Sequence, residues 1–92
     1  MNENFFSSRL KNPFLPNEIH LSDKGINFKT RNLFSSSENF VLYHDIAGVE
    51  IDKGLFLADI RIKARAREQE IHIENFTKTD ASEIKRLILE RV

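Results

Sequence analysis

The chain has 92 residues, of which 40% are hydrophobic, and eight Phe and one Tyr are its aromatic residues. Fourteen Lys and Arg balance fourteen Asp and Glu, so no overall field favours nucleic acid or an anionic membrane as a partner. The absence of cysteine excludes a disulfide framework, a thiolate zinc site and a cysteine nucleophile. The start of the chain lacks the pattern of a secretory signal, and no apolar run is long enough to span a membrane. We therefore expect one small cytoplasmic domain.

Residues 1–16 are the least patterned stretch, because two prolines interrupt any continuous element. The apolar side chains considered for an interaction role in this arm are Phe5, Phe6, Leu10 and Phe14. We favour an arm that packs on the main body, and the alternative is an exposed arm that recruits a partner or a second copy. The chain is accordingly divided into an N-terminal arm, 1–16, and a domain, 17–92.

Short strands with alternating polar and apolar residues begin after the arm, at 18–21 and 26–29. Ser22-Asp23-Lys24-Gly25 between them predicts a turn with Gly25 in the left-handed region. Asp-Lys-Gly recurs at 52–54 and predicts the same turn. Residues 35–39 are expected to form a polar loop before a strand at 40–44, and residues 45–48 a bend or bulge.

The clearest alternation covers residues 57–67. Ile60, Ile62, Ala64 and Ala66 fall on one face, and four cations, Arg61, Lys63, Arg65 and Arg67, fall on the other. A second strand follows at 70–74. If the chain reverses at 68–69, Arg67 faces Glu70, Arg65 faces His72 and Lys63 faces Glu74.

The last element is predicted to be an amphipathic helix. Ala81, Ile84, Leu87, Ile88 and Val92 recur at helical intervals. Thr77, Thr79 and Asp80 are good N-terminal caps, and Asp80 and Glu83 have the spacing of a capping box. We expect this helix to cover the sheet.

Catalytic and metal sites find little support. The glycines are isolated, and His20, His44 and His72 belong to three different predicted strands. His44 and Asp45 are neighbours in an extended stretch, so their side chains should point to opposite faces. We expect no enzyme, no cofactor and no metal. Phe28, Phe40 and Phe56 are assigned to the core, which leaves no stacking platform for nucleic-acid bases.

The four cations of residues 61–67 have two interpretations. They form a docking strip for phosphate groups, or they belong to a solvated face whose cross-strand carboxylates cancel their field. We favour the solvated face.

Taken together, the elements predict a mainly β (α+β) domain: a strongly bent antiparallel sheet, or partly open barrel, of about six to seven strands capped by one C-terminal helix. The hairpin at 19–26, the phrase Tyr43-His44-Asp45-Ile46-Ala47-Gly48-Val49-Glu50 and the ending at 73–81 resemble the bacterial pleckstrin-homology-like (PH-like) domains. Six strands are evident where that fold has seven, and residues 3–10 are the candidate for the seventh.

The resemblance implies recognition rather than catalysis. We expect a non-enzymatic protein-interaction or self-assembly module whose partner is another protein or a second copy in a homo-oligomer. Some relatives hold phosphoinositide headgroups in a basic loop between the first two strands. The alternative is therefore peripheral binding of anionic lipid through Lys24, Lys29, Arg31 and the cations at 61–67. A hydrolase or isomerase built on His44 and Asp45 is a remote third interpretation.

Overall fold

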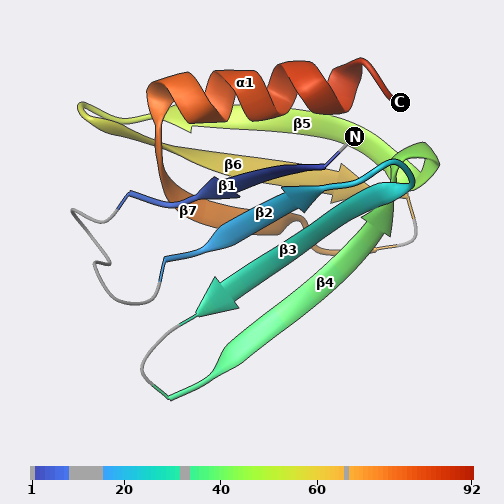
Figure 1. Ribbon diagram of the computed structural model, residues 1–92, viewed down its shortest axis with the longest axis horizontal. Coiled ribbons are helices and arrows are strands. Elements are labelled where there is room, and N and C mark those ends of the chain that lie inside the picture. Colours follow the sequence, from blue (N-terminus) through green and yellow to red (C-terminus); the bar gives the residue numbers. More distant parts are fainter. Residues whose placement is uncertain (1, 9–15, 32–33, 66) are drawn as a thin grey trace.

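The computed structural model describes residues 2–8, 16–31, 34–65 and 67–92. Within these ranges the chain forms seven strands and one C-terminal helix (Figure 1). The strands are β1 (Glu3–Phe6), β2 (Glu18–Leu21), β3 (Gly25–Arg31), β4 (Ser36–Leu42), β5 (Ile46–Lys53), β6 (Leu57–Ala64) and β7 (Ile71–Thr77). A 3-10 turn, η1 (Tyr43–Asp45), joins β4 to β5, and helix α1 (Lys78–Leu89) follows β7 directly.

The strands form two antiparallel sheets, ordered β1-β2-β3-β4 and β5-β6-β7. The seventh strand comes from residues 3–10, as expected, because β1 pairs with β2 through Glu3 and Leu21. Two backbone hydrogen bonds join the sheets at separate places, from Ser8 N to Asn75 O (2.6 Å) and from Arg65 N to Asp45 O (2.7 Å). The strands of the described ranges do not close into a full barrel, and the prediction of a mainly β, partly open fold with one helix is confirmed.

The core lies between the two sheets and α1. Strands β2 and β3 contribute Ile19, Leu21, Ile26 and Phe28, and strands β6 and β7 contribute Ile60, Ile62, Ile73 and Phe76. The helix adds Ala81, Ile84, Leu87 and Ile88, which lie on one face at the predicted spacing. Each large side chain buried in this way contributes about 1.5–3 kcal/mol. Figure 1 shows α1 alongside β5, with the β3–β4 hairpin on the opposite side of the molecule.

The helix begins one turn earlier than a cap at Asp80 would require. Thr77 is the N-cap, and its hydroxyl accepts a hydrogen bond from Asp80 N at 3.1 Å. The predicted capping box of Asp80 and Glu83 is therefore wrong, and the Glu83 carboxylate instead accepts hydrogen bonds from Arg86. Val92 lies beyond the helix and is exposed rather than buried.

Gly25 is required for a different reason from the one predicted. No described glycine has a positive φ, so Gly25 is not in the left-handed region, and Gly54 is not either. At Gly25 a Cβ atom would lie 2.4 Å from Val41 O and 2.7 Å from the Phe40 ring. Glycine therefore allows β3 and β4 to approach each other closely at this point.

The polar stretch predicted as a loop belongs to β4 from Ser36 onward. Its side chains are mostly exposed, but they bond across the strands: Asn27 Nδ2 donates to Glu38 Oε1, and the Thr30 and Ser37 hydroxyls share a hydrogen bond, both at 2.5 Å. This segment forms a strand because its backbone pairs with β3, not because it buries apolar side chains. Its sequence therefore lacks the alternation that would predict a strand.

The predicted register of the last hairpin is wrong by four residues. Strand β6 ends at Ala64, and His72 is opposite Arg61 rather than Arg65. The β6–β7 ladder ends at the pair Ile62–Ile71, while β6 continues beside β5 to Ala64 and Arg65 N then bonds to Asp45 O, so the chain reverses through a longer loop. Ala66 lies outside the described residues. The bulge predicted within 45–48 is confirmed, since the β5–β6 register shifts between Ile46 and Gly48.

Two of the three phenylalanines assigned to the core lie at the surface. Phe28 is buried, but Phe40 is half exposed and Phe56 is 78% exposed. Phe40 lies on the outer side of β4, next to Gly25. Phe56 lies in the β5–β6 turn rather than in a strand. In the described part of the chain, no helix is long and apolar enough to cross a membrane.

Candidate functional site

The tip of the β5–β6 hairpin carries two large apolar side chains in solvent. A hydrogen bond from Gly54 N to Leu57 O (2.8 Å) closes a turn whose two outer residues are Leu55 and Phe56. These are 81% and 78% exposed. Two-residue hairpin turns commonly need glycine, asparagine or aspartate at positive φ, but neither residue has a positive φ. Neither the backbone nor the core therefore requires an apolar residue at either position.

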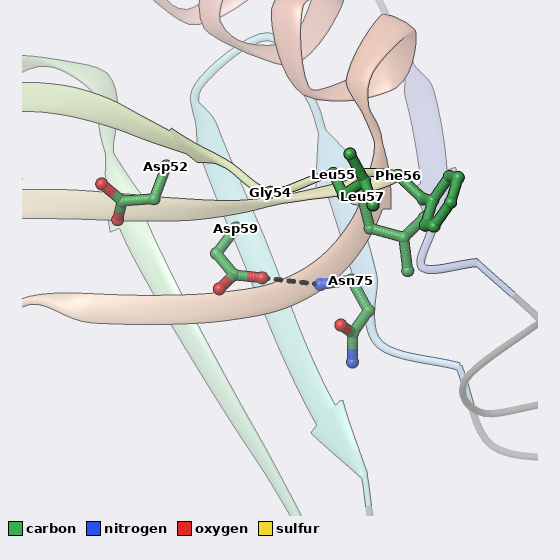
Figure 2. A pocket seen from close by; sticks show the side chains of 7 residues that line it. All are labelled: Asp52, Gly54, Leu55, Phe56, Leu57, Asp59 and Asn75. Atoms are coloured by element: carbon green, nitrogen blue, oxygen red, sulfur yellow. Dashed lines mark hydrogen bonds between the residues drawn. The ribbon is translucent and has the colours of Figure 1, made fainter.

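A shallow cleft lies beside this tip, at the hairpin end of the β5-β6-β7 sheet (Figure 2). Its volume is about 290 Å³. The three strands and the turn all contribute lining residues, which are Asp52, Gly54, Leu55, Phe56, Leu57, Asp59 and Asn75. Figure 2 shows Leu55, Phe56 and Leu57 gathered at the hairpin end, with Asp59 and Asn75 next to each other on β6 and β7. The cleft thus combines an apolar wall with polar groups.

The polar side of the cleft is built on a β-bulge. Ala58 pairs with Phe76 and Ile60 with Ile73, so Asp59 alone faces two residues of β7. One of them, Asn75, has a φ of 71°, a left-handed conformation that asparagine tolerates better than most residues. Asn75 N donates to Asp59 Oδ1 at 3.1 Å, and Asn75 O accepts from Ser8 N. These bonds tie Asn75 to β6 through Asp59 and to the segment after β1 through Ser8.

Carboxylates predominate on the outer face of the β5-β6-β7 sheet. The pairs Asp52–Asp59, Glu50–Arg61 and Gly48–Lys63 alternate with buried pairs, and His72 lies opposite Arg61. On this face the strands carry four carboxylates, from Glu50, Asp52, Asp59 and Glu74, against the two cations Arg61 and Lys63. With His72 neutral, four minus two leaves two excess negative charges, and counting Glu70 just before β7 and Arg65 just after β6 leaves the excess unchanged.

Arg61 pairs with two nearby carboxylates. It binds the Asp52 carboxylate through Nε (2.6 Å) and Nη2 (3.2 Å), and its Nη1 lies 3.4 Å from Glu70 Oε2. The hydrogen bonds from Arg61 lower the pKa of Asp52, and the same contacts raise the pKa of Arg61. Arg61 therefore has two carboxylate partners and is held within its own sheet.

The seven cations proposed for lipid binding lie on both sheets. Lys24 is in the turn between β2 and β3, not between the first two strands, which are β1 and β2. Arg31 on β3 is paired with the nearly buried Glu18 at 2.5 Å, and Lys29 faces Glu18 and Glu38 in the register. On the second sheet and its following loop are Arg61, Lys63, Arg65 and Arg67. Arg67 donates to Asn39 Oδ1 at 3.1 Å.

Of the four arm residues proposed for interaction, Phe5 and Phe6 are described. Phe5 is half-buried and packs against the core. Phe6 is 45% exposed, and its ring meets the His20 ring edge-on at 6.3 Å between centroids. Leu10 and Phe14 lie outside the described residues.

The three histidines remain apart, each with a different acidic neighbour. His20 contacts Glu18, His44 contacts Asp45 and His72 lies near Asp59, at 3.0, 3.4 and 3.8 Å. The prediction that His44 and Asp45 point to opposite faces is wrong, because both lie in the 3-10 turn η1 rather than in a strand. Among the described residues, no three His, Asp or Glu side chains are grouped to hold a metal ion.

The sequence interpretation missed the residues that form the cleft. Phe56 was assigned to the core and Leu55 was given no role, although the preceding Asp-Lys-Gly already indicates a turn. Extending that turn by two residues would have placed both at an exposed tip. Nothing in the local sequence indicates the bulge at Asn75, which depends on the pairing of β6 with β7.

Comparison with known proteins gives one match. No curated protein and no solved structure matches the chain significantly. A family model described as a bacterial PH domain matches residues 9–90. The match includes β2 to β7 and α1, and the observed fold of two antiparallel sheets with a C-terminal helix agrees with it. The chain belongs to the bacterial PH domain family.

Proposed function

We propose that this chain is a non-catalytic protein-interaction module that binds through the tip of its β5–β6 hairpin. Domains of this family are in general binding modules. The observation that carries the proposal is the pair Leu55 and Phe56, which stand in solvent beside the cleft. Exposed apolar side chains next to a concave surface are typical of protein contacts. The partner is another protein or a second copy of the chain.

The distribution of charge favours a protein over an anionic lipid surface. A headgroup site needs several cations converging on one phosphate. Arg31 and Arg61 are instead paired with carboxylates on different sheets. The sheet face beside the hairpin carries excess negative charge, which repels an anionic bilayer.

A double substitution at the tip separates binding from folding. About one fifth of each side chain is buried, so Leu55→Ser with Phe56→Ser should cost only about 0.3–0.6 kcal/mol of folding free energy per residue, a fifth of the value for full burial. If a partner buries both side chains, their loss should remove at least about 2 kcal/mol of binding, or roughly thirtyfold in affinity.

The measurement is quantitative capture of proteins from native extract by wild-type and doubly substituted chains, together with light scattering for self-association. Leu89→Ser is the control, because Leu89 is a half-exposed apolar residue on α1, away from the tip. We expect the tip variant alone to lose a captured protein or its self-association. Equal capture and equal self-association by all three chains would contradict the proposal.

A further inference from the structure

We infer that the partner presents a basic segment with an apolar side chain, which enters the cleft while its Lys or Arg side chains meet the carboxylates around it. This inference rests on the proposed function and adds the chemistry of the partner. Three features carry it: the size of the cleft, its apolar wall and the charge of the adjoining sheet face.

The cleft is the size of a side-chain site. Its volume of about 290 Å³ lies just below the ~300–1,000 Å³ typical of sites for whole small molecules. Leu57 joins the exposed Leu55 and Phe56 in the wall. One or two apolar side chains of a partner would fill this space and cover the tip, as anchor residues do in protein interfaces.

The sheet face beside the cleft favours a cationic partner, and the one cation bonded to the tip among the described residues is Lys78, whose Nζ donates to Leu55 O at 3.0 Å. The chain as a whole is neutral, whereas the outer face of β5, β6 and β7 carries two excess negative charges. Glu50 and Glu74 are both exposed. Within the described residues neither carboxylate accepts a hydrogen bond, although Glu50 lies opposite Arg61 and attracts its guanidinium across the strands. Glu74 is next to Asn75 in the bulge, and Glu50 lies two residues before Asp52 on β5.

These two carboxylates are the groups that a partner can engage without breaking an existing bond. Asp52 is already held by Arg61, and Asp59 accepts from Asn75 N. A guanidinium suits Glu50 and Glu74 best, because it can bind a carboxylate through two parallel hydrogen bonds. An acidic segment would meet repulsion at the same positions, which gives the site selectivity.

The test uses two short synthetic peptides in NMR titrations of the ¹⁵N-labelled full chain. In one, leucine and phenylalanine alternate with arginine; in the other, glutamate replaces every arginine. We expect the arginine peptide to shift the amide signals of residues 54–59 and 74–75, and the glutamate peptide to leave them unchanged. Glu50→Gln with Glu74→Gln should weaken binding roughly three- to tenfold, from the loss of two exposed ion pairs.

The control is Glu3→Gln with Glu68→Gln, which removes two exposed carboxylates elsewhere and should leave the affinity within about twofold, since distant rim charges have little effect. Equal binding of both peptides, no effect of the Glu50 and Glu74 changes, or no shift with the arginine peptide would overturn the inference. The proposed function would survive all three results, because it depends on the capture lost with Leu55 and Phe56. Phe56-dependent sedimentation with vesicles of phosphatidylcholine and phosphatidylglycerol would overturn both, because the tip would then bind lipid.

Discussion

Replacing Gly25 by alanine should destabilise the fold although the backbone conformation at this position suits any residue. The new Cβ atom would lie 2.4 Å from Val41 O, 2.7 Å from Phe40 Cζ and 3.1 Å from Leu42 Cα. The Phe40 ring is half exposed and can rotate away. The Val41 carbonyl belongs to the backbone of β4, so it moves only if β3 and β4 separate.

The expected loss is about 2 kcal/mol. Overpacking costs ~1–3 kcal/mol, and the upper part of that range applies because the closest atom is in the backbone. Alanine also lowers the conformational entropy of the unfolded chain relative to glycine, which stabilises the folded variant by ~0.4–1 kcal/mol. A loss of this size lowers the melting temperature by roughly 10 °C in a domain of this length.

Urea denaturation followed by circular dichroism measures the change, with Phe40→Ala as the reference background. Since the Val41 contact governs the cost, Gly25→Ala should remain destabilising by a similar amount when Phe40 is already alanine. A loss below about 0.5 kcal/mol, within the range of an ordinary surface substitution, would refute the close approach of β3 and β4. Full rescue by Phe40→Ala would show that the ring alone is responsible.

Three further predictions concern the cleft and two perturbed groups. Asn75→Ala should lose about 1–2 kcal/mol in urea denaturation because of its positive φ, whereas Asn75→Gly should lose none; equal losses would contradict the left-handed geometry. Burial raises the pKa of Tyr43, so its contribution to stability is complete below the unfolded pKa of about 10 and is lost as pH rises through the folded value. Ultraviolet titration of the phenolate should accordingly give a higher midpoint in the folded chain than in urea. Arg61 lowers the pKa of Asp52. The stability that the Asp52 carboxylate contributes is therefore present above its unfolded pKa and is lost as pH falls through its folded pKa. In carboxyl NMR titrations, Arg61→Gln should raise the pKa of Asp52 toward its ordinary value, and an unchanged midpoint would argue against the ion pair.

The fold was predictable wherever burial imposes a period on the sequence. The alternation at Ile60 and Ile62 and the helical spacing of Ala81, Ile84 and Leu87 both match buried faces. The second half of β4 was predicted as a strand, but its first half, 36–39, was predicted as a loop because these residues are mostly exposed and polar and are held by backbone pairing with β3. The register of β6 with β7 was not predicted correctly, because β6 continues beside β5 after its pairing with β7 ends and because a bulge at Asp59 shifts the pairing; neither feature shows in the local sequence.

The cleft was the least predictable part, for related reasons. A turn of Leu55 and Phe56 without positive φ leaves no glycine or asparagine to mark its apex. Asn75 reads as an ordinary strand residue until its pairing with Asp59 is known. Arg61 was recognised as part of a cationic strand face, but its bond to Asp52 depends on the register of β5 with β6, which a turn predicted at 52–54 does not determine.

The claim that the β5–β6 tip is the protein-binding surface is tested most directly by photo-crosslinking in the producing cell. A photoreactive p-benzoylphenylalanine replaces Phe56 in one chain and Leu89 in another, and covalent adducts are identified after irradiation. Because Phe56 is 78% exposed beside the cleft, we predict a defined protein adduct, either a partner or a second copy, from position 56 and not from position 89. The absence of any adduct at 56, or the same adducts in equal amounts from both positions, would contradict the proposed binding surface.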